Sequence, residues 1–270
     1  MCLLVVAFGL DPRVPLVVGA NRDERLDRPA TAMTVLRGTR PRILGGRDLE
    51  AGGTWLAVNE HGVVAGLTNR PLPDGRDRAK RTRGELPLRL ATARSATEAV
   101  DAFVAGVRPA DYNPAWFLVG DRHALYAVDL TDGPRPGAVA LGPGLHILEN
   151  APLDAASAKT AHVRGLLEGS GPPAGDGLAL RLRAVLADHE IPDAPGERSG
   201  RRAETRAACV HTPDYGTRSS TVISVPADDG VLPAVAYADG APCTALFVDA
   251  AALWSASGAD DVSGSPPGPG

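Results

Sequence analysis

The chain opens with MCLLVVAFGLDPRVPLVVGANRDE, residues 1–24, and this stretch decides the fold. Residues 3–8 form a continuous apolar run, and residues 15–20 form a second one. The segment between them contains Asp11-Pro12, a pair that is typical of turns. Two short apolar runs around such a turn predict a β-hairpin that is buried on both faces.

Cys2 directly follows the initiator methionine. Met1 is normally removed when the next side chain is as small as cysteine, and the mature chain would then begin with a thiol and a free α-amine on one residue. The reference pKa of an α-amine is about 7.7–8.0, so a useful fraction of it is an unprotonated base at neutral pH. Cys2 therefore has the groups of a nucleophile and of its base. Because any residue can follow Met1 by chance, this position alone decides nothing.

Later segments extend the pattern of paired strands. Residues 54–58 and 63–68 flank the turn-forming stretch Asn59-Glu60-His61-Gly62 and predict a second hairpin. Grouped hairpins and grouped helices favour an α+β fold of mainly antiparallel sheets over alternating βαβ units. Further strands are predicted over residues 116–119, 125–128, 145–148, 219–225, 234–237 and 244–248, and helices over 84–94, 99–105, 155–167 and 178–189.

The length of 270 residues fits one large domain or two small ones. We find no internal repeat and no Pro/Ser linker, so a single domain is predicted over residues 1–256. Glycine and proline recur in residues 257–270, and this segment is predicted to be a disordered tail.

Composition excludes several function classes. The net charge is −4 and aromatic residues make up 4% of the chain, so neither a basic patch nor stacking platforms indicate nucleic-acid binding. Three cysteines cannot all pair, and no CxxC spacing suggests a metal, which fits a reducing compartment. The opening apolar run is too short for a signal peptide or a membrane span. We therefore expect a cytoplasmic protein without a membrane span.

Polar clusters follow several predicted strands, and such strand ends are where sites are commonly assembled. Asn and Asp in these places are also frequent turn formers whose side chains bond their own backbone, so both interpretations stay open for each cluster. The clusters are Asn21-Arg22-Asp23-Glu24-Arg25, Thr68-Asn69-Arg70, Glu149-Asn150 and Arg218-Ser219-Ser220-Thr221.

Glycine pairs and histidines give weaker signals. Gly45-Gly46 and Gly52-Gly53 neither precede a helix nor carry the lysine of a phosphate loop, so glycine-driven turns account for them better. The histidines show no paired ligand spacing, and we expect them to be solvated or satisfied in the core. They include His123, His146, His162 and His189.

Several motifs together resemble one known family. Met1-Cys2 followed by Asn21-Arg22-Asp23-Glu24 resembles the NRDE, or transport-and-Golgi-organisation-protein-2, family, and the resemblance extends over residues 1–248. The stretch at 155–159 departs from it, because the family usually has an aromatic Pro-Trp-Pro-Lys-like sequence there. The other matching motifs are Gly45-Gly46-Arg47-Asp48, Gly52-Gly53-Thr54-Trp55, Thr68-Asn69-Arg70, Arg83-Gly84-Glu85-Leu86 and Tyr215-Gly216-Thr217-Arg218-Ser219-Ser220-Thr221.

This family is similar to the N-terminal-nucleophile hydrolases, among them choloylglycine hydrolases and penicillin V acylases. The resemblance implies a four-layer αββα sandwich with the first residue at the edge of a sheet. It implies that Cys2 is the nucleophile and that Asp23 holds the α-amine. The resemblance also implies roles at the centre for Asn69, Asn150 and Arg218, the last beside the thiolate, and substrate contacts from Arg22, Asn21 and Thr68.

Simple chemistry agrees with those implied roles. Asp23 would raise the pKa of the α-amine, and Arg218 would lower that of the thiol. Either Asn69 or Asn150 would donate an amide N–H to a tetrahedral oxyanion. The resulting reaction is hydrolysis of a small acylated amine through a thioester, or acyl transfer if a second amine enters. It needs no metal or organic cofactor.

The resemblance also suggests a second class of function. Members of the family are implicated in lipid and haem handling, so the same fold would serve as a non-enzymatic binder of a lipid, acyl-coenzyme A or haem. Cys2 or a histidine would then be the ligand of haem. The sequence names no substrate and leaves the oligomeric state open.

Overall fold

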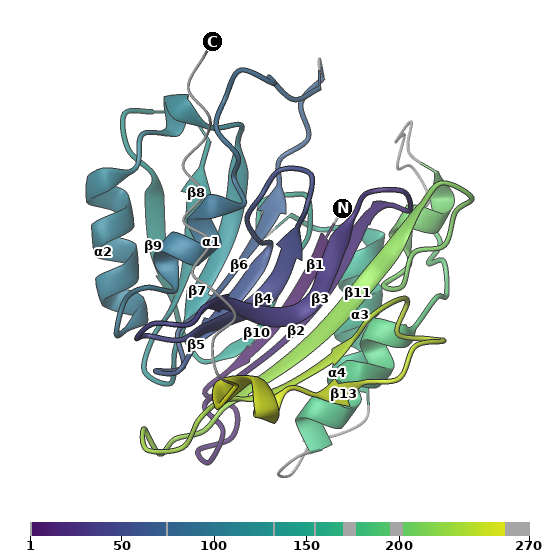
Figure 1. The fold of residues 1–270 in the computed structure, drawn as a ribbon. Helices are drawn as coiled ribbons and strands as arrows, with labels where there is room; N and C mark the ends of the chain where they lie inside the picture. The colour runs from purple at the N-terminus through teal and green to yellow at the C-terminus, as the bar shows by residue number, and fades with distance from the viewer. Residues whose placement is uncertain are drawn as a thin grey trace.

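Two antiparallel sheets form the centre of the molecule (Figure 1). The computed structural model describes residues 2–73, 75–131, 133–153, 155–169, 177–194 and 202–256. The first sheet has the order β10 (Gly144–Leu148), β1 (Cys2–Phe8), β2 (Leu16–Arg25), β11 (Tyr215–Val225), β12 (Ala234–Ala238) and β13 (Val248–Asp249). The second has the order β3 (Ala30–Arg37), β4 (Ile43–Asp48), β5 (Leu56–Asn59), β6 (Val64–Asn69), β7 (Ala115–Gly120), β8 (Leu125–Leu130) and β9 (Gly137–Leu141).

Helices cover the outer face of each sheet (Figure 1). Helices α1 (Glu85–Leu90) and α2 (Ala96–Gly106) pack on the second sheet, and α3 (Ala158–Glu168) and α4 (Gly177–Ala187) pack on the first. A further apolar core fills the space between the two sheets. These layers form the four-layer αββα sandwich of an α+β protein, and the predicted fold class is confirmed.

Strand β1 shows why its sequence has no polar alternation. Leu4 and Val6 face the second sheet, whereas Leu3 and Val5 face α3 and α4. Both faces of the strand are therefore buried, which requires a continuous apolar run. β1 pairs with β2 along its whole length, with Cys2 opposite Arg22. The predicted opening hairpin is thus confirmed, but β2 extends to Arg25, so the polar tetrapeptide lies inside the strand.

Helix α2 begins at Ala96, three residues before its predicted start. Ser95 accepts a hydrogen bond from the backbone of Glu98 at 3.1 Å, which starts α2. Helix α1 is shorter than predicted and ends at Leu90. No helix in the described part of the chain is long and apolar enough to span a membrane.

The structure corrects several local predictions. Gly45 and Gly46 lie in strand β4 rather than in a turn. A Cβ on Gly46 would lie 2.3 Å from the ring of Trp55, so the missing side chain permits close packing. Gly52 and Gly53 do form a turn, with φ of 65° and 126°. Strands β3, β4 and β9 were not predicted, and of the strand expected over residues 244–248 only Val248 belongs to a strand. The predicted tail lies outside the described residues.

Candidate active site

A cavity of about 490 Å³ opens where strands of both sheets end. Cys2 lies at the start of β1 and lines this cavity. Arg22 on β2 and Asn69 at the end of β6 line it as well. Cys2 is partly exposed, and Asp23, Arg83 and Tyr215 also line the cavity. The structure therefore brings Cys2, Arg22, Asp23 and Asn69, all of which were predicted site residues, to one concave surface.

Asn150 holds the backbone of Cys2 and joins the two sheets. Its Oδ1 accepts a hydrogen bond from the backbone nitrogen of Cys2 at 2.9 Å. Its Nδ2 donates to the backbone carbonyl of Asn69. Both ends of this amide are thereby occupied. The side chain of Asn69, by contrast, lines the cavity.

Asp23 is almost fully buried at the wall of the cavity, within a cluster of polar groups. Thr217 donates a hydrogen bond to its Oδ1 at 2.6 Å, and Tyr215 donates to its backbone carbonyl at 2.7 Å. The Nζ of Lys159 lies 4.0 Å from Oδ2, and both side chains are almost fully buried. Burial raises the pKa of Asp23, whereas the charge of Lys159 and the bond from Thr217 oppose that rise.

Sequence reasoning missed Lys159. Lys159 belongs to the stretch 155–159, which departs from the sequence pattern of the family. A signal was present, because Ser157 and Thr160 form a capping box that fixes the start of α3. This start places Lys159 in the first turn of α3, where its side chain is 2% exposed.

The surroundings of the Cys2 thiol favour its protonated form. Burial raises the pKa of the thiol, and the charge of Asp23 raises it further. The charge of the terminal ammonium, a hydrogen bond from the backbone of Asp23 and the charge of Arg22 act in the opposite direction, but the net pKa is raised. A thiol in this state needs a neighbouring base before it can act as a nucleophile.

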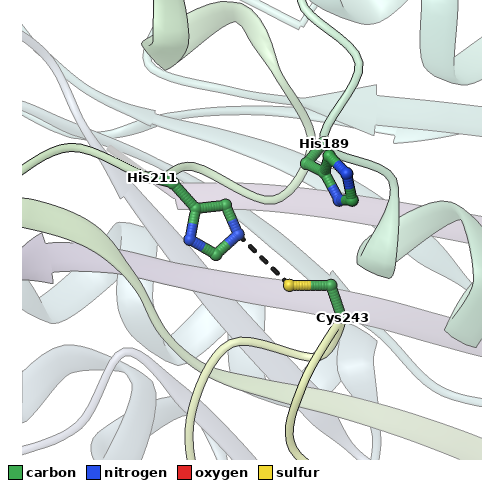
Figure 2. Close-up of side chains that lie close together, drawn as sticks. All are labelled: His189, His211 and Cys243. Carbon is green, nitrogen blue, oxygen red and sulfur yellow. Dashed lines mark hydrogen bonds between the residues drawn. The ribbon is translucent and has the colours of Figure 1, made fainter.

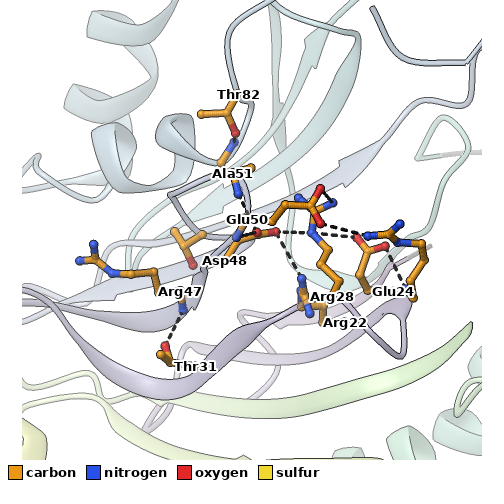
Figure 3. Close-up of polar contacts among 12 residues, drawn as sticks. Arg22, Glu24, Arg28, Thr31, Arg47, Asp48, Glu50, Ala51 and Thr82 are labelled. Carbon is orange, nitrogen blue, oxygen red and sulfur yellow. Dashed lines mark hydrogen bonds and ion pairs between the residues drawn. The ribbon is translucent and has the colours of Figure 1, made fainter. Parts of the chain in front are cut away.

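An ion-pair network holds Arg22 in place (Figure 3). Its guanidinium lies over the ring of Trp55, 4.4 Å from the centroid, and its Nη2 lies 3.3 Å from Asp48. Arg28 binds the same carboxylate at 2.8 Å and Glu50 at 3.2 Å. Burial alone would raise the pKa of Asp48, but its hydrogen bonds and the two arginines hold it below the ordinary value.

Further cations line the cavity from the segment between β6 and α1. They are Arg76, Arg78, Lys80, Arg81 and Arg83. Arg83 donates to the carbonyl of Pro114 at 2.9 Å, and burial lowers its pKa to about 10. None of these residues was among the predicted site residues, although Arg83 belongs to one of the motifs that carry the family resemblance.

The structure does not bring Arg218 to Cys2. Strand β11 has an irregularity between Thr217, which pairs with Asp23, and Ser219, which pairs with Arg22. Arg218 is therefore an extra residue, and such a bulge redirects its side chain. Its guanidinium donates to the carbonyl of Leu26, and it lines a separate hollow. The charge of Arg22 acts on the Cys2 thiol, and that of Cys2 acts on Arg83.

Asn21 and Thr68 also lie outside the residues that line the cavity. Asn21 is 1% exposed, and its Nδ2 donates to the carbonyls of Leu186 at 2.8 Å and Ala208 at 2.9 Å. It ties β2 to α4 and to the segment before β11. Thr68 is fully buried on β6. Of the three predicted substrate-binding residues, Arg22 alone lines this cavity.

Comparison with known proteins places the chain in a family. The family model described as Transport and Golgi organisation 2 matches residues 1–232. The Transport and Golgi organization protein 2 homolog of Bos taurus is 33% identical over 255 residues, covering 86% of this chain and 91% of the relative. The homolog of Homo sapiens is 31% identical over 266 residues with the same coverage.

Solved structures of N-terminal-nucleophile hydrolases share the fold. The Caenorhabditis elegans ortholog of N-acylethanolamine-hydrolyzing acid amidase has a TM-score of 0.52 at 13% identity, covering 82% of this chain and 92% of its own. A mutant of the conjugated bile acid hydrolase from Clostridium perfringens has a TM-score of 0.50 at 11% identity, covering 93% and 92%. The resemblance inferred from the motifs is confirmed: the chain belongs to the Transport and Golgi organisation 2 family and has the fold of the N-terminal-nucleophile hydrolases.

Proposed function

We propose that this protein is an N-terminal-cysteine amidohydrolase or acyltransferase that acts on a small acylated amine. The observation that carries the proposal is the placement of Cys2. Cys2 is among the residues that line the cavity, and its backbone nitrogen donates to Oδ1 of Asn150 at 2.9 Å. Removal of Met1 would turn that nitrogen into a free amine on the same residue as the thiol.

The amine would supply the base that the thiol needs. It takes the proton from sulfur, and the thiolate attacks the carbonyl carbon of the substrate. We assign the donor to the resulting oxyanion to Asn69, which is among the residues that line the cavity, because Asn150 uses its Oδ1 and one N–H to hold Cys2 and Asn69. One such donor is worth about 2.7–4 kcal/mol in the transition state.

The α-ammonium then returns its proton to the leaving nitrogen as the carbon–nitrogen bond breaks. The acyl group remains on sulfur as a thioester. Water gives a proton to the amine and attacks the thioester, which releases the acid and restores the thiol. If a second amine attacks instead of water, the product is a new amide. The carboxylate of Asp23 favours the ammonium form of the amine throughout.

The charge of the cavity supports an anionic substrate. Arg22 and Arg28 are engaged by Asp48 and Glu50, and Arg76 and Arg81 by Glu50 and Glu85, but the lining has seven cationic residues against five carboxylates. A carboxylate or phosphate on the acylated amine would be attracted by them. A long apolar chain would find a charged lining rather than an apolar one.

The test is a panel of acyl amides, each compared with a matched analogue that lacks the anionic group, with intact mass measured on the same sample. We expect a mass without Met1, preferential turnover of the anionic amides, and a loss of more than about 1,000-fold in Cys2→Ala. Circular dichroism checks that the variant is folded.

A second outcome would favour pure binding. Tight haem or acyl-coenzyme A binding that Cys2→Ala leaves unchanged, with no turnover in the panel, would contradict the enzymatic proposal. Loss of haem binding in Cys2→Ala would instead identify Cys2 as its ligand, because no histidine is among the described residues that line this cavity.

A further inference from the structure

Two cysteines and two histidines lie near one another, away from the cavity that contains Cys2, and Figure 2 shows three of them, His189, His211 and Cys243. Cys209 and His211 lie between the 3₁₀ helix η2 (Ala203–Arg206) and β11. Cys243 follows β12, and His189 follows α4. None of the four lines the Cys2 cavity. Sequence spacing gave no hint of the cluster, because the residues come from three separate segments.

The ligand atoms of Cys209, Cys243 and His211 have the separations of three ligands in a tetrahedral metal site. Sγ of Cys209 lies 3.8 Å from Sγ of Cys243. Nε2 of His211 lies 3.4 Å from the first sulfur and 3.2 Å from the second. Tetrahedral zinc with Zn–S of about 2.3 Å and Zn–N of about 2.0–2.1 Å requires ligand separations of about 3.8 Å for S···S and about 3.5 Å for S···N.

The candidate for the fourth ligand, His189, is grouped with His211 and Cys243 but not with Cys209. Ligand atoms of His189, His211 and Cys243 lie within 4.8 Å of one another. The two imidazole rings stand at 83° with their centroids 6.1 Å apart, so they do not stack face to face. His189 is exposed after the end of α4, and its side chain has the freedom to close the remaining distance.

The backbone fixes the ligands in advance. The backbone of Cys209 donates to the carbonyl of Asp188 at 2.7 Å, which holds it beside His189. A bridge between His211 and Gly216 continues the pairing that leads into β11. Cys243 lies in a turn closed by bonds from Thr244 and Ala245 to Ala241. Preformed backbone of this kind is what a structural metal site needs.

We propose that Cys209, Cys243, His211 and His189 bind one Zn²⁺ ion in a closed structural site. Two thiolates and two imidazoles are soft and borderline ligands that select zinc over calcium or magnesium. Binding forms two Zn–S and two Zn–N bonds and releases two protons, one from each thiol.

A disulfide between the two cysteines is the competing explanation. It requires an S–S distance of about 2.0 Å. It would also leave unexplained why Nε2 of His211 lies against both sulfurs. The structure has Cys209 and Cys243 as free thiols 3.8 Å apart.

The zinc site would support the wall of the Cys2 cavity. Val210, between two of the ligands, exchanges hydrogen bonds with Thr217, at 2.8 Å to its hydroxyl and 2.9 Å from its backbone. The same hydroxyl donates to Asp23. Zinc would thus stabilise the segment that holds Asp23 without touching the substrate.

The test measures zinc content of the full chain expressed with added zinc and purified under reducing conditions without chelator. We expect one zinc ion per chain, and absorption bands of tetrahedral cobalt with thiolate charge transfer when Co²⁺ replaces zinc. Cys243→Ser and His211→Ala should each weaken zinc binding by more than about 100-fold, since even loss of a second-shell partner costs about 10–100-fold. Cys2→Ala and His123→Ala are the matched controls and should retain the ion.

If a variant fails to fold, the zinc content of the wild-type chain still tests the proposal. Absence of stoichiometric zinc after reconstitution of the reduced wild-type protein would overturn the proposal. So would a Cys209–Cys243 disulfide in the freshly purified chain, or zinc that persists in the double variant Cys243→Ser/His211→Ala. Loss of the ion in Cys2→Ala would assign it to the other cavity and would also overturn the proposal.

Discussion

The buried pair of Lys159 and Asp23 offers the sharpest test of the site's electrostatics. Nζ and Oδ2 are 4.0 Å apart, and the two side chains are 2% and 0% exposed. At an effective dielectric constant of about 20, unit charges at this distance attract each other by about 4 kcal/mol. Removing one partner of such a pair leaves an uncompensated buried charge and costs about 3–5 kcal/mol.

The perturbation is a double-mutant cycle with Asp23→Asn and Lys159→Met. Asparagine keeps the acceptor for Thr217, and methionine keeps the length of the lysine side chain. Each single variant should lower the free energy of unfolding by about 3–4 kcal/mol, and the double variant by little more than one single variant. The cycle should therefore give a coupling energy of about 3 kcal/mol.

The assay is urea unfolding at pH 7, followed by tryptophan fluorescence. The exposed pair of Arg108 and Asp111, 3.0 Å apart with side chains 78% and 29% exposed, serves as the control. Its coupling energy should not exceed about 1 kcal/mol. A value that small for Lys159 and Asp23 would refute the reasoning, since it would mean that the two groups are not a buried charge pair.

Four further predictions follow from the same structure. Gly46→Ala should lower the free energy of unfolding by about 1–3 kcal/mol, because its Cβ would meet Trp55 at 2.3 Å, whereas Gly142→Ala, with open space around it, should change it little in thermal unfolding. Acidification should destabilise the fold through Asp48, because the pKa of its carboxyl is lower in the folded chain than in the unfolded chain. Its contribution to the free energy of unfolding is present above the unfolded pKa and is lost as the pH falls through the folded pKa. Asp48→Asn should therefore flatten this part of a plot of unfolding free energy against pH. Chain that retains Met1 can be prepared with the methionine aminopeptidase inhibited. Iodoacetamide should alkylate Cys2 more slowly at pH 7.5 in that chain than in chain from which Met1 has been removed. Equal rates would contradict a role for the α-amine as base. In processed chain, Arg22→Gln should slow that alkylation by raising the pKa of the thiol, and an equal effect of Arg218→Gln would contradict the placement of Arg218 outside the cavity.

Much of the fold was predictable because both faces of the central strands are buried. The continuous apolar runs of β1 and β7 follow directly from lying between an inter-sheet core and a helix layer. Strands β3 and β9 were not predicted because they are edge strands with few buried side chains. Met33 alone is buried in β3, and β9 is mostly exposed. Strand β4 was not predicted because its glycines suggest a turn, and the ring that packs against Gly46 belongs to Trp55, nine residues further along the chain.

The candidate site was predictable in part. Cys2, Asp23 and Asn69 follow from their motifs, and the structure places them at one cavity. The position of Arg218 depends on a one-residue bulge, which flips a side chain without leaving a signal in the sequence. Lys159 and the cluster around Cys243 depend on contacts between distant segments, and such contacts have no fixed spacing along the chain.

Mass spectrometry of the first peptide tests the central claim most directly. The protein is mixed with an anionic acyl amide, quenched in acid within the first turnover and digested. We expect a peptide that starts at Cys2 and carries the acyl group on sulfur. Hydroxylamine should remove this acyl group, and the Cys2→Ala variant should not carry it. A peptide that still begins with Met1 during active turnover, or an acyl group that resides on another residue, would contradict the account.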